Sequence, residues 1–377
     1  MPRTDLPTYH SAVKSRLSSA FHTPLGVGIV AAVVVVAVAV AVQLSRGGSS
    51  GYAVHRLVSD GGVPALATDK ALVNGWGLAA TPTGVWWTTN EASGTSTLYS
   101  GTGRKQLLTV SVPGGPTGIT AYGGDGFRVS GGGVSDPARF IYACEDGRIR
   151  AWTPTVPRGW STRSEIVVDG AAQGAIFRGV AIAGGRLYAT DFHNDRVDVF
   201  DSRWRPVHLP GTFADPAVSP WFAPDNIQAF GGHLFVTFVG RAPVDGNDAP
   251  TGGYVDEFDL NGRLVASVAR MGVLNEPWGL ALAPSSFGRY AGDLLVANFG
   301  DGHVNAFRKS NGRWAFDGAL AGANGRPIAV NGLWGIAFGN GGAAGAKDEL
   351  FFSSGPHLWR GPTELSTHGL FGSISAA

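Results

Sequence analysis

The chain has 377 residues, and 29 Lys and Arg residues nearly balance 28 Asp and Glu residues, so the formal net charge is only +1. Such a near-neutral chain lacks the basic surface by which proteins bind nucleic acid. The chain contains 57 glycines without a Gly-X-Y period, and 10% of its residues are aromatic, which excludes collagen and disorder and favours a turn-rich all-β protein.

The first predicted element is an apolar transmembrane helix at residues 25–44. Residues 25–42 carry no polar side chain and would rise about 27 Å as a helix, close to the ~30 Å core of a bilayer. Arg3, Lys14 and Arg16 precede it, so the positive-inside rule keeps residues 1–24 in the cytoplasm and the rest of the chain outside. The segment reads as an uncleaved signal-anchor; the alternative is secretion after cleavage near Ala39-Val40-Ala41. We expect residues 45–51 to be a flexible Gly/Ser linker.

Residues 52–377 contain a unit that recurs six times. Each unit begins with an apolar strand that carries a recurring small residue, at Gly77, Gly118, Gly179, Asn226, Gly279 and Gly335. Further strands with alternating apolar residues follow, bounded by Gly, Asn and Asp. Four strands in about 50 residues, repeated six times, predict an all-β six-bladed propeller of the NHL/TolB-like type. The recurring glycine is expected where the innermost strands approach each other closely.

Closure of the ring is also predicted. The sixth unit has strands at 334–338 and 349–353 and a short run at 369–374, but no outer strand of its own. The unpaired strand at 52–58 can supply it, which would join the two ends of the domain in one blade and remove the open edge of the sheet. The single cysteine, Cys144, is expected to be a small core residue of a strand.

Residues 187–200 and 294–307 resemble the NHL repeat, in which an apolar strand, Asp and a polar turn precede Val and an aromatic residue. More closely, the chain resembles a bacterial family of uncharacterised, exported, NHL-like propeller proteins. The resemblance covers about residues 52–375 and is carried by segments 72–79, 115–119, 138–147, 223–228, 277–284, 333–341 and 368–374. It implies a six-bladed fold and, because that family has no established activity, no reaction.

Polar side chains fall in the loops that a propeller gathers at one mouth, where the outer-to-inner connections and the second-to-third turns emerge. Amides and carboxylates in a ring are ligands suited to Ca²⁺ or Mg²⁺, as in metal-dependent propeller lactonases. The candidate metal ligands are Asn74, Asp225, Asn226, Glu276, Asn298 and Asn331. The competing interpretation is that Asn and Asp occupy these positions because tight turns require them.

A second pattern concerns the residue directly before each recurring Gly or Asn. Units one, five and six carry Trp76, Trp278 and Trp334 there. Units two, three and four carry Thr117, Arg178 and Asp225. In a closed ring the tryptophans would face a polar arc, and Trp76, Trp278, Trp334, Arg178 and Asp225 would suit a sugar or another amphipathic small ligand. The alternative is that the tryptophans pack as core between blades.

The sequence therefore predicts a membrane-tethered propeller outside the cytoplasm that acts as a binding or scaffold module for a small molecule or a protein, not for nucleic acid. A loop at 239–253 with Asp245, Asn247 and Asp248 enlarges the fourth unit on the mouth side. The alternative function is a divalent-metal-dependent hydrolase of the lactonase type at the mouth. Within residues 52–377 no serine stands in the Gly-x-Ser-x-Gly pattern of a nucleophile elbow.

Overall fold

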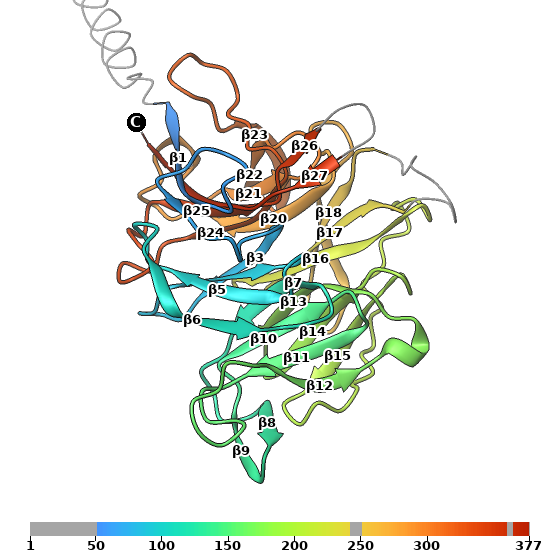
Figure 1. Ribbon diagram of the computed structural model, residues 1–377. Helices are drawn as coiled ribbons and strands as arrows, with labels where there is room; N and C mark the ends of the chain where they lie inside the picture. Colours follow the sequence, from blue (N-terminus) through green and yellow to red (C-terminus); the bar gives the residue numbers. More distant parts are fainter. Residues whose placement is uncertain (1–50, 242–250, 360–364, 377) are drawn as a thin grey trace, which may run out of the picture. The chain divides into compact units, whose positions relative to one another are not determined.

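The computed structural model describes residues 51–241, 251–359 and 365–376. These residues form a six-bladed propeller in which the innermost strands contact one another in order around one axis (Figure 1). The innermost strands are β3 (Gly75–Ala80), β7 (Pro116–Ala121), β13 (Phe177–Ala183), β16 (Phe222–Phe230), β20 (Pro277–Leu282) and β24 (Leu333–Phe338). Each contains one of the six recurring Gly or Asn residues, so the predicted six-bladed fold is confirmed.

The remaining strands of each blade pair outward from the innermost one. Blade 1 adds β4 (Trp86–Asn90), β5 (Thr95–Tyr99) and β6 (Lys105–Ser111); blade 2 adds β10 (Phe140–Cys144), β11 (Arg148–Trp152) and β12 (Glu165–Asp169); blade 3 adds β14 (Arg186–Asp191) and β15 (Arg196–Asp201). Blade 4 adds β17 (His233–Gly240), β18 (Tyr254–Phe258) and β19 (Leu264–Arg270); blade 5 adds β21 (Leu294–Asn298), β22 (Val304–Ser310) and β23 (Arg313–Ala319); blade 6 adds β25 (Leu350–Ser354), β28 (Leu370–Ala376) and β1 (Tyr52–Ser59).

Several short elements were not predicted. They are the hairpin of β8 (Arg128–Gly131) and β9 (Val134–Pro137), the hairpin of β26 (His357–Trp359) and β27 (Leu365–Thr367), the strand β2 (Ala67–Thr68), and the 3-10 helices η1 (Ala171–Gln173) and η2 (Gly288–Tyr290). Across the described part of the chain, no helix has the length and apolar character needed to cross a membrane. The predicted helix at 25–44, the preceding residues 1–24 and most of the linker at 45–51 lie outside the described residues, as do residues 242–250 of the loop at 239–253.

The ring closes through the N-terminal strand. β1 is antiparallel to β28, with Tyr52 opposite Ala376 and Ser59 opposite Leu370. Strand 52–58 therefore provides the outer strand that the sixth unit lacked in the sequence, and that prediction is confirmed. Because the two ends of the domain share one sheet, opening the ring requires breaking this strand pair.

The recurring glycines lie where neighbouring inner strands meet. A Cβ atom on Gly77 would come within 2.4 Å of the Thr117 carbonyl oxygen in the next blade, and one on Gly279 within 2.3 Å of the Trp334 carbonyl oxygen. Such distances are far below van der Waals contact, so the predicted close approach is confirmed. At the junction of blades 4 and 5 the inner strand carries Asn226 instead, whose Nδ2 donates to the Trp278 carbonyl oxygen at 2.7 Å.

Hydroxyl side chains tie the inner strands to one another. The Gly179 N–H donates to Thr190 Oγ1 at 2.7 Å, and Thr190 in turn donates to the Asp225 carbonyl oxygen of the next blade at 2.9 Å. Thr89 and Ser353 make the equivalent links from blade 1 to blade 2 and from blade 6 to blade 1. These bonds satisfy backbone groups beside the axis that would otherwise be buried without partners.

Apolar side chains that alternate along the strands fill the space between blades. The described residues form one buried cluster at each of the six junctions, and a seventh, small cluster at the axis. Cys144 belongs to the cluster between blades 1 and 2 and is fully buried, as expected. Burial raises the pKa of its thiol, so the side chain acts as a small apolar residue.

Candidate functional site

The candidate site lies at the mouth where the inner strands begin and the second strands of the blades end. A sharp backbone corner leads into four of the inner strands, with a positive φ at Asn74, Gly115, Glu276 and Gly332. Gly adopts this left-handed conformation freely, whereas Glu276, with φ 53°, does so at a cost of about 1–2 kcal/mol. The corner turns these residues toward the same end of the propeller.

The three tryptophans of the inner strands pack against one another at the axis. The Trp76 and Trp334 rings stack with centroids 3.8 Å apart, and Trp278 meets both edge-on. Phe299 covers the other face of Trp334 with a centroid distance of 4.0 Å. The tryptophans are only 5%, 3% and 8% exposed for Trp76, Trp278 and Trp334, so they form an aromatic plug rather than an open platform. Contact of these rings with a ligand stays a prediction.

The polar arc is organised around Arg178. Its guanidinium pairs with Asp225 at 2.8 Å and with Glu145 at 3.5 Å. The same group lies over the Phe192 ring, 3.8 Å from the centroid, and 5.9 Å from the centroid of Trp76. The mouth thus already stabilises one cation between carboxylates and aromatic faces, an arrangement that favours positive charge.

Two more carboxylates extend this arc. Glu91 accepts a hydrogen bond from Asn74 Nδ2 at 2.9 Å, and Asn74 Oδ1 accepts the indole N–H of Trp334 at 3.2 Å. Glu276 is half-buried and has neither a hydrogen-bond nor an ion-pair partner for its carboxylate among the described residues. Three carboxylates (those of Glu145, Asp225 and Glu276) therefore lie near one guanidinium, and the charge of Glu91 acts on Glu145.

Burial raises the pKa of Glu145, Asp225 and Glu276, and repulsion from nearby carboxylates adds to this effect for two of them. Burial raises the pKa of Glu145, and the nearby charges of Glu91 and Asp225 add to it, while Arg178 opposes both. Burial likewise raises the pKa of Asp225 against the effect of Arg178. For Glu276, burial and the charge of Asp225 raise the pKa. One guanidinium does not compensate the acidic groups of the mouth, which would be stabilised by a further cation.

The amides proposed as metal ligands use Nδ2 in structural hydrogen bonds, whereas the oxygens Oδ1 of Asn226 and Asn298 are buried and have no partner among the described residues. Asn226 Nδ2 bonds to the Trp278 carbonyl oxygen, and Asn331 Nδ2 to the His357 carbonyl oxygen at 3.2 Å. Asn298 Nδ2 donates to the Val273 carbonyl oxygen at 2.8 Å. Within the described ranges, no three His, Cys, Asp or Glu side chains are grouped closely enough to hold a metal ion. A site that combines amide and carboxylate oxygens at the axis stays a prediction.

Phe192 and Phe299 at the mouth were not predicted as site residues. Each directly follows the second strand of its blade, the same place in the repeat that Glu91 and Glu145 occupy in blades 1 and 2. A search for polar residues cannot find them, whereas an alignment of the six units at the end of the second strand would have done so. The arrangement as a whole can hold a cationic group next to aromatic surface.

Solved structures share the propeller fold at low sequence identity. A structure titled glucose dehydrogenase matches with a TM-score of 0.53 and 12% identity, covering 81% of this chain and 98% of that chain. A catalytically inactive virginiamycin B lyase from Staphylococcus aureus with quinupristin matches with a TM-score of 0.50 and 10% identity, covering 86% and 99%. At such identities these likenesses concern the fold alone.

Sequence relatives are found in a virus. The chain is 32% identical over 301 residues to "Uncharacterized protein L690" of Acanthamoeba polyphaga mimivirus, covering 76% of this chain and 78% of that protein. It is 33% identical over 301 residues to "Uncharacterized protein R648" of the same virus, covering 76% and 73%. No protein-family model matches. The expected bacterial family was wrong, although the six-bladed fold that it implied is right: the chain belongs to the family of these two uncharacterised mimivirus proteins.

Proposed function

We propose that the propeller is a binding module that recognises the cationic group of a small molecule at its mouth. The observation that carries this proposal is the imbalance of charge, since Arg178 is the one cation that acts on Glu145, Asp225 and Glu276 among the described residues. A bound cation would offset the cost of burial, which raises the pKa of all three carboxyl groups, and the repulsion that adds to it at Glu145 and Glu276. Phe192 and Phe299, which are partly exposed at the mouth, would supply apolar surface to the rest of the ligand.

Two further features support a ligand here. Glu276 occupies a strained backbone position that glycine fills without strain in blades 2 and 6, and such outliers gather at functional sites. The indole N–H groups of Trp76 and Trp278 are buried and have no acceptor among the described residues. An oxygen atom on the ligand could accept from them, so the best candidate is a cationic molecule that also carries hydroxyl or carbonyl groups.

The test is calorimetric titration of the full-length protein with glucosamine, with N-acetylglucosamine as the neutral counterpart, and with Ca²⁺. We expect glucosamine to bind and the acetylated sugar to bind at least about tenfold more weakly, because it lacks the charge. Binding of Ca²⁺ alone would assign the mouth to a metal ion instead. Equal binding of both sugars, or of none of the three, would contradict the proposal.

A matched pair of variants locates the binding site. Glu276→Gln removes one negative charge at the mouth, and Asp348→Asn removes one from the exposed loop between β24 and β25, at the other end of blade 6. The proposal requires weaker glucosamine binding in the first variant and unchanged binding in the second. Equal losses in both would indicate non-specific attraction to an acidic protein.

A metal-dependent hydrolase of the lactonase type is the second candidate, and Glu276 favours it. A half-buried carboxyl with a raised pKa and no partner is suited to general acid–base catalysis. A panel of lactones and esters, assayed with Ca²⁺ or Mg²⁺ and with a chelator, tests this function. Metal-dependent turnover that Glu276→Gln abolishes would support it, and turnover that survives this substitution would not.

We further propose that residues 25–44 tether the propeller to a membrane and that the propeller lies outside the cytoplasm. The support is the apolar sequence with its preceding basic residues. Alkaline extraction of membranes and protease treatment of intact cells provide the test. A protein that stays in the membrane fraction and is digested from outside supports the proposal, and a protein released by alkali contradicts it.

A further inference from the structure

The third blade has an outer edge unlike the others. The other five sheets each have a fourth strand, namely β6, β12, β19, β23 and β1, whereas the sheet of blade 3 ends at β15. The chain that follows β15 stays beside it only briefly. Pro206 and Pro210 lack the N–H that a neighbouring strand would donate. The N–H groups of Gly211 and Phe213 donate to the turn between β18 and β19 of blade 4 instead of to β15.

The hydrogen bonds show which backbone groups of β15 face outward. The Asp201 N–H donates to the Arg205 carbonyl oxygen at 2.9 Å, and the Val199 carbonyl oxygen accepts from the Val207 N–H at 2.8 Å. Outward-facing residues alternate along an antiparallel strand, so Val197 faces the same way. In the described part of the chain, neither the N–H nor the C=O of Val197 has a backbone partner on that side, and neither does the Val199 N–H.

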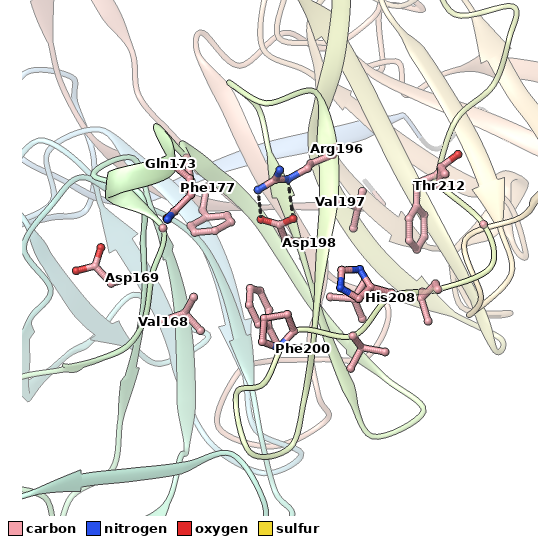
Figure 2. Close-up of a pocket in the computed structure, with 18 residues that line it drawn as sticks. Val168, Asp169, Gln173, Phe177, Arg196, Val197, Asp198, Phe200, His208 and Thr212 are labelled. Atoms are coloured by element: carbon pink, nitrogen blue, oxygen red, sulfur yellow. Dashed lines mark hydrogen bonds and ion pairs between the residues drawn. The ribbon is translucent and has the colours of Figure 1, made fainter.

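A cavity of about 610 Å³ occupies the place of the missing strand. Figure 2 shows Phe177, Phe200, Val168 and His208 around it, with the ion pair of Arg196 and Asp198 at its upper side. The two charged groups are held by a contact of 2.7 Å between Arg196 Nε and Asp198 Oδ1. The lining is therefore apolar along the strand edge, and both of its carboxylates are paired with arginines, since Asp169 Oδ2 also contacts Arg148 Nε at 3.2 Å.

We propose that this cavity binds an extended peptide of another protein, which adds to β15 as the fourth strand of blade 3. Alternating unpaired N–H and C=O groups at a strand edge match a polypeptide backbone, and few other ligands offer donors and acceptors at that spacing. Apolar side chains of the peptide enter the cavity between the blades. The apolar lining, whose charged groups are already paired, favours a peptide that carries apolar side chains at alternate residues.

A synthetic peptide with the sequence of residues 263–270 is a suitable probe, because those residues form an outer strand in blade 4 and carry apolar side chains at alternate residues. Its labelled form is titrated with the full-length protein by fluorescence anisotropy. Hydrogen exchange with peptide bound is expected to slow at the amides of Val197 and Val199. A peptide N-methylated at alternate residues should bind at least about tenfold more weakly, because it cannot donate to β15.

Two variants of one residue distinguish strand addition from non-specific peptide binding. Val197→Pro removes the outward N–H while leaving the pairing with β14 intact, since proline is tolerated at a strand edge. Val197→Thr keeps both the backbone groups and the side-chain shape. We expect at least about tenfold weaker binding in the first and near-native binding in the second. Circular dichroism confirms that both are folded.

Leu209→Trp, which fills the cavity from its rim, should also weaken binding and covers the case in which Val197→Pro does not fold. Equal peptide binding by wild type and either blocking variant would overturn the proposal, as would no binding at millimolar peptide. A dimer that Val197→Pro dissociates would also overturn it, since a second copy would then occupy the edge. Glu276→Gln should leave peptide binding unchanged, so the result does not depend on the function proposed for the mouth.

Discussion

The two arcs of the propeller mouth occupy the same position of the repeat and have opposite properties. Blades 5, 6 and 1 place Trp278, Trp334 and Trp76 there, and these side chains bury one another. Blades 3 and 4 place Arg178 and Asp225 there, in an ion pair surrounded by further carboxylates. The repeat therefore determines where a side chain lies, and the chemistry of that side chain determines whether it stabilises the ring or remains available to a ligand.

The aromatic arc should contribute most to stability. Trp334→Ala removes a ring packed on both faces and is expected to lower the free energy of unfolding by about 3–5 kcal/mol, equally at pH 5 and pH 8. Urea denaturation at both pH values measures this. Trp221→Ala is the control, because that tryptophan is 60% exposed, and equal effects of the two substitutions would show that the plug does not stabilise the ring.

The contribution of the polar arc to the free energy of unfolding should depend on pH, whereas that of the aromatic arc should not. Arg178→Met leaves Asp225 and Glu145 without their cation, with an expected cost of about 3 kcal/mol at pH 8. Loss of the guanidinium raises the folded-state pKa of both carboxyl groups further, so stability falls as pH rises and part of it returns at pH 5. Arg313→Met, at an exposed site in β23, is the control. A loss independent of pH would contradict this reading of the arc.

A buried carboxyl group outside the mouth also makes stability depend on pH, and its contribution must be distinguished from that of the polar arc. Asp256 in β18 is fully buried and has no ion-pair partner among the described residues, and the Ser267 hydroxyl opposite it offsets the effect of burial only in part. Burial raises its pKa to about 7, so the native state loses stability as pH rises from about 4 through 7. Asp256→Asn should stabilise the protein by about 2 kcal/mol at pH 8, after the cost of the buried amide, and by less at pH 5. Thermal denaturation at both pH values is the measurement, and destabilisation at pH 8 would contradict the prediction.

The smallest effect on stability is expected at Glu276. Glu276→Gln removes a charge that has no partner, so the free energy of unfolding should change by no more than about 0.5 kcal/mol. Binding of a cationic ligand should nevertheless weaken about tenfold. Urea denaturation and calorimetry on the same sample check both. A large stability loss would place Glu276 with the structural residues of the mouth.

The fold was largely predictable because its causes are local. Gly77 and Gly279 mark the inner strands since backbone from the next blade leaves no room for a side chain, and that constraint repeats with the units. Strand 52–58 could be assigned to the sixth blade because that blade lacked a strand. The open edge of blade 3 was missed, although Pro206 and Pro210 signal it, because four strands were expected in every unit.

The site was less predictable because its properties depend on contacts between blades. Arg178 and Asp225 were identified from their place in the repeat, but Phe192 beneath the guanidinium comes from a different turn and is not polar. The sequence alone is equally consistent with Asn226 and Asn331 as metal ligands and as turn residues. Only their bonds to the Trp278 and His357 carbonyl oxygens show that they hold neighbouring backbone segments.

The most direct test of charge recognition at the mouth is the number of protons released when glucosamine binds, measured across the pH range from about 4 to 7. Calorimetry in buffers of different ionisation enthalpy gives this number. If the ammonium group enters among Glu145, Asp225 and Glu276, it lowers their raised pKa values, and the account predicts net release of protons and tighter binding as pH increases. Binding without proton release and without pH dependence would contradict it.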